Sequence, residues 1–136
     1  MIAAQDYVEI QNLYGLYNHC SDAGDGAGYA DTFTEDGIME IQPRNKIIQG
    51  RNDLITYKLA DKAERENVYR RHWNTSLHLE RIDADTVQGR CYFQAYNGTP
   101  GKLPEVTAHG VYTDTLRKVN GQWRFAKRYL VIDGRP

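Results

Sequence analysis

The chain has 136 residues, with 17 Lys and Arg against 18 Asp and Glu, and therefore a net charge of −1. This length suits one domain, and two cysteines exclude a disulfide scaffold or a cysteine-rich zinc site. The balanced charge argues against a nucleic-acid binder. No apolar stretch approaches the roughly 20 residues of a membrane helix, and the N-terminus does not look like a secretory signal. We expect a single cytoplasmic domain spanning residues 1–136, with no nucleic-acid or membrane partner.

The first half of the chain shows helical periodicity. Apolar residues recur at three- and four-residue steps over residues 5–20 and predict a helix that ends in the breaker-rich segment 21–26. Asp25 is expected to cap a short helix that reaches about residue 33. A turn at 34–37, short strands at 38–41 and 46–48, and a helix at 50–66 with Asp53 in its first turn complete this half.

From residue 69 onward the hydrophobic period changes to two. Strands are expected near residues 70–82, 86–97, 105–119 and 122–132, with Asn120-Gly121 as a two-residue hairpin turn. Helices followed by an antiparallel meander predict an α+β fold, in which the helices cover one face of a curved sheet. A sheet of this kind can enclose a cavity for a small molecule.

His72 begins the first of the long strands. Strict alternation would place Asn74, Ser76 and His78 on its face, and Trp73 with Leu77 on the other. The polar face either points to solvent or lines a polar patch inside a cavity.

Three further residues are candidates for the site, and each of them also has a structural interpretation. Asp22 follows the first helix and suits a helix end, and Tyr17, five positions earlier, suits a core aromatic. Arg128 is expected to share a strand face with Arg124, opposite Phe125. It is then either an exposed basic side chain or a clamp for an anion or a carbonyl group.

Most of the familiar catalytic and ligand-binding motifs are absent from the chain. The chain has no nucleophile elbow, phosphate loop or dinucleotide fingerprint, and no convergent set of metal ligands. We therefore expect no metal site, and neither nucleotide chemistry nor a serine hydrolase. His19 and His78 are interpreted as surface or packing residues, whereas His109 is compatible with either a cavity or solvent.

Taken together, the motifs resemble the SnoaL-like branch of the NTF2-like superfamily, and the match runs in order over nearly the whole chain. The matching motifs are Ile10-Gln11-Asn12-Leu13-Tyr14, Tyr17 with Asp22, Phe33-Thr34-Glu35-Asp36-Gly37, Ile48-Gln49-Gly50-Arg51, His72 with Asn74 and Thr75, Gly110 with Tyr112 and Asp114, and Gly121 with Trp123 and Arg128.

Within the superfamily the sequence is most similar to a group of lyases: hexachlorocyclohexane dehydrochlorinase, bile-acid 7α-dehydratase and, more distantly, scytalone dehydratase. The resemblance implies that His72 and Asp22 form a catalytic dyad, and that Tyr17, Asn74 and Arg128 contact the substrate. It also implies a cone-shaped sheet closed by helices, a homodimer or homotrimer, and a hydrophobic cyclic substrate that loses a proton from carbon without a cofactor.

Other activities of the superfamily are compatible with the same sequence. One is a non-catalytic ligand-binding protein or a relative of the small subunit of ring hydroxylases. Another is a polyketide cyclase, which can use the same His and Asp as acid and base. An epoxide hydrolase would use an Asp–Arg–Asp set, for which Asp114 and Arg128 are available but no third member is evident.

Overall fold

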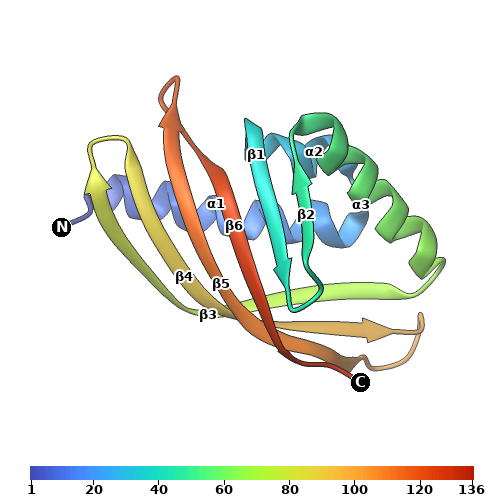
Figure 1. The fold of residues 1–136 in the computed structure, drawn as a ribbon. Coiled ribbons are helices and arrows are strands. Elements are labelled where there is room, and N and C mark those ends of the chain that lie inside the picture. The colour runs from blue at the N-terminus through green and yellow to red at the C-terminus, as the bar shows by residue number, and fades with distance from the viewer.

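A single six-stranded sheet forms the framework of the protein (Figure 1). The computed structural model describes all 136 residues. Its elements are α1 (Ala4–Ala23), α2 (Gly26–Asp31), β1 (Phe33–Gln42), β2 (Lys46–Gln49), α3 (Arg51–Arg65), β3 (Tyr69–Asp83), β4 (Thr86–Gly98), β5 (Glu105–Val119) and β6 (Gln122–Gly134). The strand order is β2-β1-β6-β5-β4-β3, and all pairs are antiparallel except β1 with β6. β3 is therefore an edge strand.

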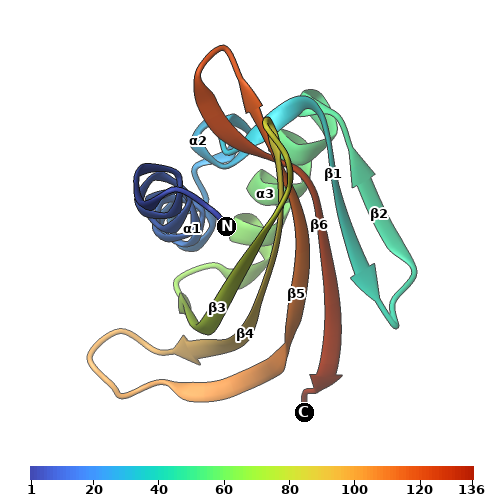
Figure 2. The same ribbon diagram turned by 90° about the vertical axis from the view of Figure 1, so that its left-hand side faces the viewer.

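The three helices lie on the concave side of the curved sheet, as Figure 2 shows. The expected α+β class is confirmed, and the four long strands lie close to their predicted ranges. The apolar stripe of α1 packs into the core through Ile10, Leu13, Tyr14 and Tyr17, all nearly inaccessible to solvent. Burial of this stripe fixes α1 across the sheet and so fixes the position of its C-terminal end.

The C-terminal end of α1 is set by Gly24. Its φ of 71° lies in the left-handed region, and its N–H closes the last turn on the carbonyl groups of Cys20 and Ser21. A side chain at this position would also collide with Lys62 of α3. The helix runs to Ala23, three residues beyond the predicted end, so that Asp22 lies within the last turn.

Among the predicted caps and turns, two are confirmed and one is wrong. Asp25 caps α2 by accepting a hydrogen bond from Gly28 N at 2.9 Å. Asn120 and Gly121 both have positive φ in the β5–β6 turn. The turn expected at residues 34–37 is instead part of β1, although its pairing with β6 is interrupted between Phe33 and Ile38.

Bulges in β3 and β6 change which side chains face the helices. Ser76 has a φ of 59°, and the pairing of β3 with β4 is interrupted just after Thr75. Strict alternation is therefore wrong for β3: His72 and Leu77 are both partly buried, whereas Trp73 is 66% exposed.

A second bulge occurs at Ala126, where β6 skips one residue against β5. Arg128 consequently lies on the buried face with Phe125 rather than with Arg124. The prediction that Arg128 and Arg124 share a face is wrong for this reason.

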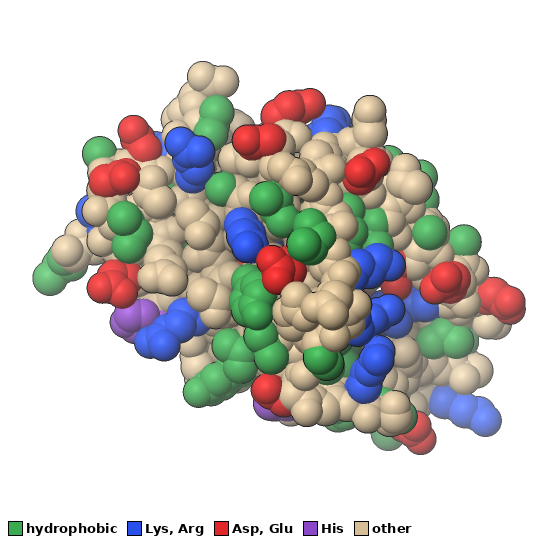
Figure 3. All heavy atoms as spheres, viewed as in Figure 1, with side chains coloured by type: hydrophobic (Ala, Val, Ile, Leu, Met, Phe, Trp, Pro, Cys, Tyr) green, Lys and Arg blue, Asp and Glu red, His purple; other side chains and the backbone are tan.

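Acidic and basic side chains are interspersed on the face shown in Figure 3, with apolar side chains between them. No helix of the protein combines the length and apolar character needed to cross a membrane.

Candidate active site

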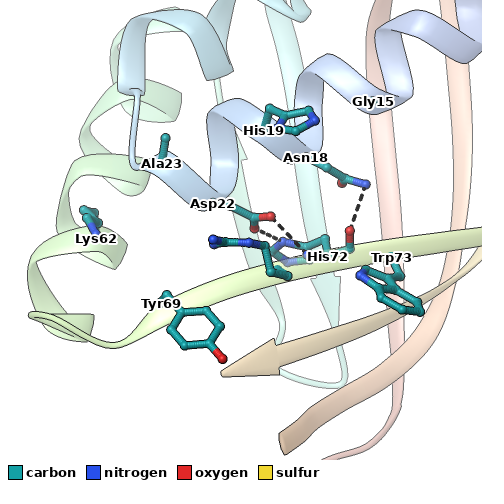
Figure 4. Close-up of a pocket in the computed structure, with 10 residues that line it drawn as sticks. Gly15, Asn18, His19, Asp22, Ala23, Lys62, Tyr69, His72 and Trp73 are labelled. Carbon is teal, nitrogen blue, oxygen red and sulfur yellow. Dashed lines mark hydrogen bonds and ion pairs between the residues drawn. The ribbon is translucent and has the colours of Figure 1, made fainter. Parts of the chain in front are cut away.

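A groove of about 700 Å³ lies between the C-terminal half of α1, the start of the edge strand β3 and α3 (Figure 4). This volume is in the usual range for small-molecule sites. The residues that line it are Gly15, Asn18, His19, Asp22, Ala23, Lys62, Tyr69, Arg71, His72 and Trp73. Two of the five predicted site residues, Asp22 and His72, are among them.

Asp22 and His72 are in direct contact at this groove. Oδ1 of Asp22 lies 2.5 Å from Nδ1 of His72, and Oδ2 accepts the backbone N–H of His72 at 3.1 Å. Because a carboxylate only accepts hydrogen bonds, Nδ1 carries the proton and Nε2 holds the free lone pair. The side chains are 10% and 12% exposed, so the pair is shielded from water but reachable.

The electrostatic surroundings favour a neutral imidazole. Burial lowers the pKa of His72 below its ordinary value of 6.5, against the opposing effect of the Asp22 carboxylate. The nearby charges of Lys58 and Arg70 lower the pKa further. At neutral pH, therefore, His72 is a base with an unoccupied Nε2, and Nε2 has no hydrogen-bond partner within the chain.

Two asparagines tie α1 to β3 beside this pair. Nδ2 of Asn18 donates to Oδ1 of Asn74 at 2.8 Å and approaches the carbonyl oxygen of His72 at 3.4 Å. Figure 4 shows Asn18 and Asp22 reaching from α1 toward His72, while His19 points away. Asn74 therefore contacts the helix rather than the groove, and Asn18 is a site residue that the sequence interpretation missed.

Tyr17 and Arg128 lie in the protein core and do not line the groove. The Tyr17 hydroxyl is 3.2 Å from that of Tyr29. Arg128 is completely buried and makes a two-point ion pair with Asp114, with Nε–Oδ1 at 2.9 Å and Nη2–Oδ2 at 3.0 Å. The Tyr14 hydroxyl donates to the same carboxylate at 2.6 Å.

Aromatic rings enclose the Arg128 guanidinium group. Its Cζ is 3.6 Å from the ring centre of Tyr112 and 4.3 Å from those of Tyr17 and Phe125. Burial opposes the charge, but the Asp114 carboxylate together with the Tyr112 and Tyr17 side chains outweighs it and raises the pKa of Arg128. Arg128 is therefore paired with Asp114 inside the core and does not contact a ligand in the groove.

A cluster of buried cations supports the end of α1 that carries Asp22. Nζ of Lys58 donates to Oγ of Ser21 at 2.8 Å, and Nη2 of Arg65 donates to the Asp22 carbonyl at 3.3 Å. Asp61 lies between the cations, within ion-pair distance of Lys58, Arg65 and Arg70. Cations near a helix C-terminus are favourable, and here they help to offset the cost of a carboxylate at that end.

The buried position of Lys58 predicts a pH effect on stability. Burial lowers the pKa of Lys58 to about 8, whereas an unfolded lysine titrates near 10.4. Between these values the unfolded chain binds more protons, so stability rises with pH. Relative to Lys58→Met, the native protein is expected to gain roughly 3 kcal/mol of unfolding free energy from pH 7.5 to 10.5.

Urea denaturation at several pH values measures this gain. Lys62→Met is a matched control on the same helix, since Lys62 is partly exposed. An identical pH dependence in the native protein and in Lys58→Met would contradict the interpretation.

The other histidines lie away from the Asp22–His72 pair. His78 is exposed on β3, and His109 is exposed with Nδ1 at 3.9 Å from Asp133. His109 therefore does not face the groove. No group of three or more His, Cys, Asp or Glu side chains is arranged to hold a metal ion.

Comparison with solved structures supports the fold. The chain resembles Rv3472, a protein of unknown function from Mycobacterium tuberculosis, with 34% identity, TM-score 0.83, and 94% of this chain and 72% of that chain covered. A Catenulispora acidiphila protein in complex with S-DNPA shows 28% identity and TM-score 0.84, with 96% of each chain covered.

A third structure identifies the fold by name. It is an NTF2-like protein with a cystatin-like fold from Novosphingobium aromaticivorans, with 20% identity, TM-score 0.81, and 96% of this chain and 84% of that chain covered. No curated protein matches the sequence. The model of the SnoaL-like domain matches residues 3–129, and the chain belongs to this family.

Proposed function

We propose that the protein is a cofactor-independent lyase that removes a proton from a carbon atom of a cyclic, mostly apolar small molecule. The observation that carries the proposal is the contact between Asp22 and His72 in a groove of ligand size. Small-molecule binding is consistent with the family, since the Catenulispora acidiphila relative is in complex with a small molecule. The homodimer or homotrimer implied by the family resemblance stays a prediction.

His72 is proposed to act as the general base. Nε2 takes a proton from a carbon next to a carbonyl group, which leaves an enolate and an imidazolium. Asp22 keeps Nδ1 protonated and stabilises the imidazolium by charge. The two-point contact with the side chain and backbone of His72 fixes the carboxylate, so little reorganisation accompanies the proton transfer.

The second half of the reaction uses the same proton. The enolate expels a β-hydroxyl group, Nε2–H of His72 donates its proton to it, and the products are an enone and water. We assign this acid role to His72 because Tyr17 and Arg128, which the family resemblance implied as substrate contacts, are engaged in the core. Attack of the enolate on a second carbonyl group, as in a polyketide cyclase, begins with the same proton abstraction.

Exchange of carbon-bound hydrogen tests the first step without any leaving group. In D₂O, the protein is expected to replace the C2 hydrogens of 1-tetralone faster than buffer does, as measured by proton NMR. With 3-hydroxy-1-tetralone, water is lost and the enone rearranges to fluorescent 1-naphthol. Exchange without 1-naphthol formation would favour a cyclase, and exchange at the buffer rate would contradict the proposal.

Activity is expected to fall only at acidic pH. A general base must be neutral, and the pKa of His72 is lowered by burial. The rate should therefore be constant around pH 7 and decrease as pH falls below 6.5, with an apparent pKa lower than that of free histidine. A pH profile of kcat/KM for 1-tetralone exchange measures this limb, and a limb centred above pH 7 would contradict the assigned protonation state.

A further inference from the structure

The groove contains positive charge without a protein partner. Lys62 and Arg71 line it, and no carboxylate lies within ion-pair distance of either side chain. Asp22 is the one carboxylate among the lining residues, and it is engaged by His72. Arg71 is partly fixed, since its Nη1 donates to the carbonyl of Arg70 at 2.7 Å, and its remaining donors are free.

The layer behind the groove adds to this positive charge. Within the groove and the buried cluster, cations outnumber carboxylates five to two: Lys58, Lys62, Arg65, Arg70 and Arg71 against Asp22 and Asp61. The whole chain, by contrast, has a net charge of −1. The local excess favours an anion because partly buried cations are weakly screened.

Aromatic rings on β3 provide a surface for a planar ring. Tyr69 and Trp73 both line the groove and flank His72 along the strand (Figure 4). Trp73 is 66% exposed and packs against Tyr96 at 5.1 Å between ring centres, so its position is supported while a face stays accessible. Arg71 lies over the Tyr69 ring at 5.2 Å, which brings a guanidinium group next to the aromatic surface. An aromatic ligand gains from stacking here.

We propose that the groove binds a planar aromatic molecule that carries an acidic group, with Arg71 and Lys62 holding the acidic group and Trp73 and Tyr69 contacting the ring. The proposal rests on the proposed function in using the same groove, and it names the class of substrate. Arg71 is the main anchor, because a guanidinium group presents several fixed donors to a carboxylate or a phosphate.

Isothermal titration calorimetry with three naphthalene probes tests the proposal on the whole chain. The probes are 2-naphthoate, 2-naphthyl phosphate and the neutral 2-naphthamide. At least one anionic probe is expected to bind about tenfold more tightly than the amide, and 0.5 M salt should reduce this preference. The tighter of the two anions identifies the acidic group as a carboxylate or a phosphate.

Variants show whether the preference arises in the groove. The double variant Lys62→Gln/Arg71→Gln is expected to reduce the anion preference below about threefold. Trp73→Ala should weaken the binding of all three probes by a similar factor. Arg90→Gln removes an exposed cation on β4 and should change nothing. Equal binding of amide and anions, no binding of any probe, or a preference that survives the double variant would overturn the proposal.

Failure of this proposal can be distinguished from failure of the proposed lyase function. His72→Ala is expected to keep the anion preference while losing proton exchange. Tight anion binding by a protein that exchanges no carbon-bound hydrogen would refute the lyase proposal alone. Exchange of 1-tetralone without any anion preference would refute the substrate class alone.

Discussion

Replacement of His72 by alanine is expected to lower kcat/KM for 1-tetralone exchange by about 10²–10⁴-fold, the usual contribution of a general base. The fold should persist, because the imidazole is at the groove rather than among the fully buried core residues. Exchange rates by NMR, together with circular dichroism, check both statements.

Asp22→Asn should also lower kcat/KM for 1-tetralone exchange, but for a different reason. An amide has nearly the same shape as the carboxylate, but it brings no charge to stabilise the imidazolium and no longer enforces the Nδ1–H tautomer. His78→Ala is the matched control, since His78 is exposed on the same strand. Full activity in a folded His72→Ala variant would remove the basis of the proposed mechanism.

Asp114→Ala is expected to cause the largest loss of stability, roughly 3–5 kcal/mol, because it leaves the Arg128 charge buried without its partner. The ion pair is completely inaccessible to solvent and also accepts the Tyr14 hydroxyl. Chemical denaturation measures the loss. Asp133→Ala, at an exposed carboxylate on β6, should change stability little.

A double variant shows whether this stability loss comes from an unpaired buried charge or from the loss of a stabilising contact. Asp114→Leu/Arg128→Met replaces both charged groups with apolar ones and is expected to be more stable than Asp114→Ala. Should the double variant be less stable than Asp114→Ala, the loss of stability would come from the missing contact and not from an unpaired buried charge.

The sequence predicted features that depend on neighbouring residues. Asp25 and Asn120-Gly121 were located correctly because helix capping and hairpin turns are decided within a few residues. The periodicity of α1 was equally informative, and the resemblance that brought Asp22 together with His72 supplied a contact between residues 50 positions apart.

The predictions that failed involve bulges, which periodicity cannot reveal. The extra residues at Ser76 and Ala126 shift the alternation, so that Leu77 shares the partly buried face of His72 and Arg128 lies in the core. Ser76 is not a residue type that favours positive φ, so nothing in its identity announced the bulge. The cluster around Asp61 was also missed, since charged residues on a helix usually indicate a solvated face.

The proposed mechanism requires that burial keeps His72 neutral and that Asp22 holds the imidazole proton on Nδ1, which leaves the lone pair on Nε2. Nitrogen-15 NMR of the histidine side chains, with His72→Ala for assignment, measures the tautomer and the pKa without a substrate. We expect the Nδ1–H form of His72 at pH 7 and a pKa below 6.5. An Nε2–H tautomer, or an imidazole that is protonated at pH 7, would contradict it.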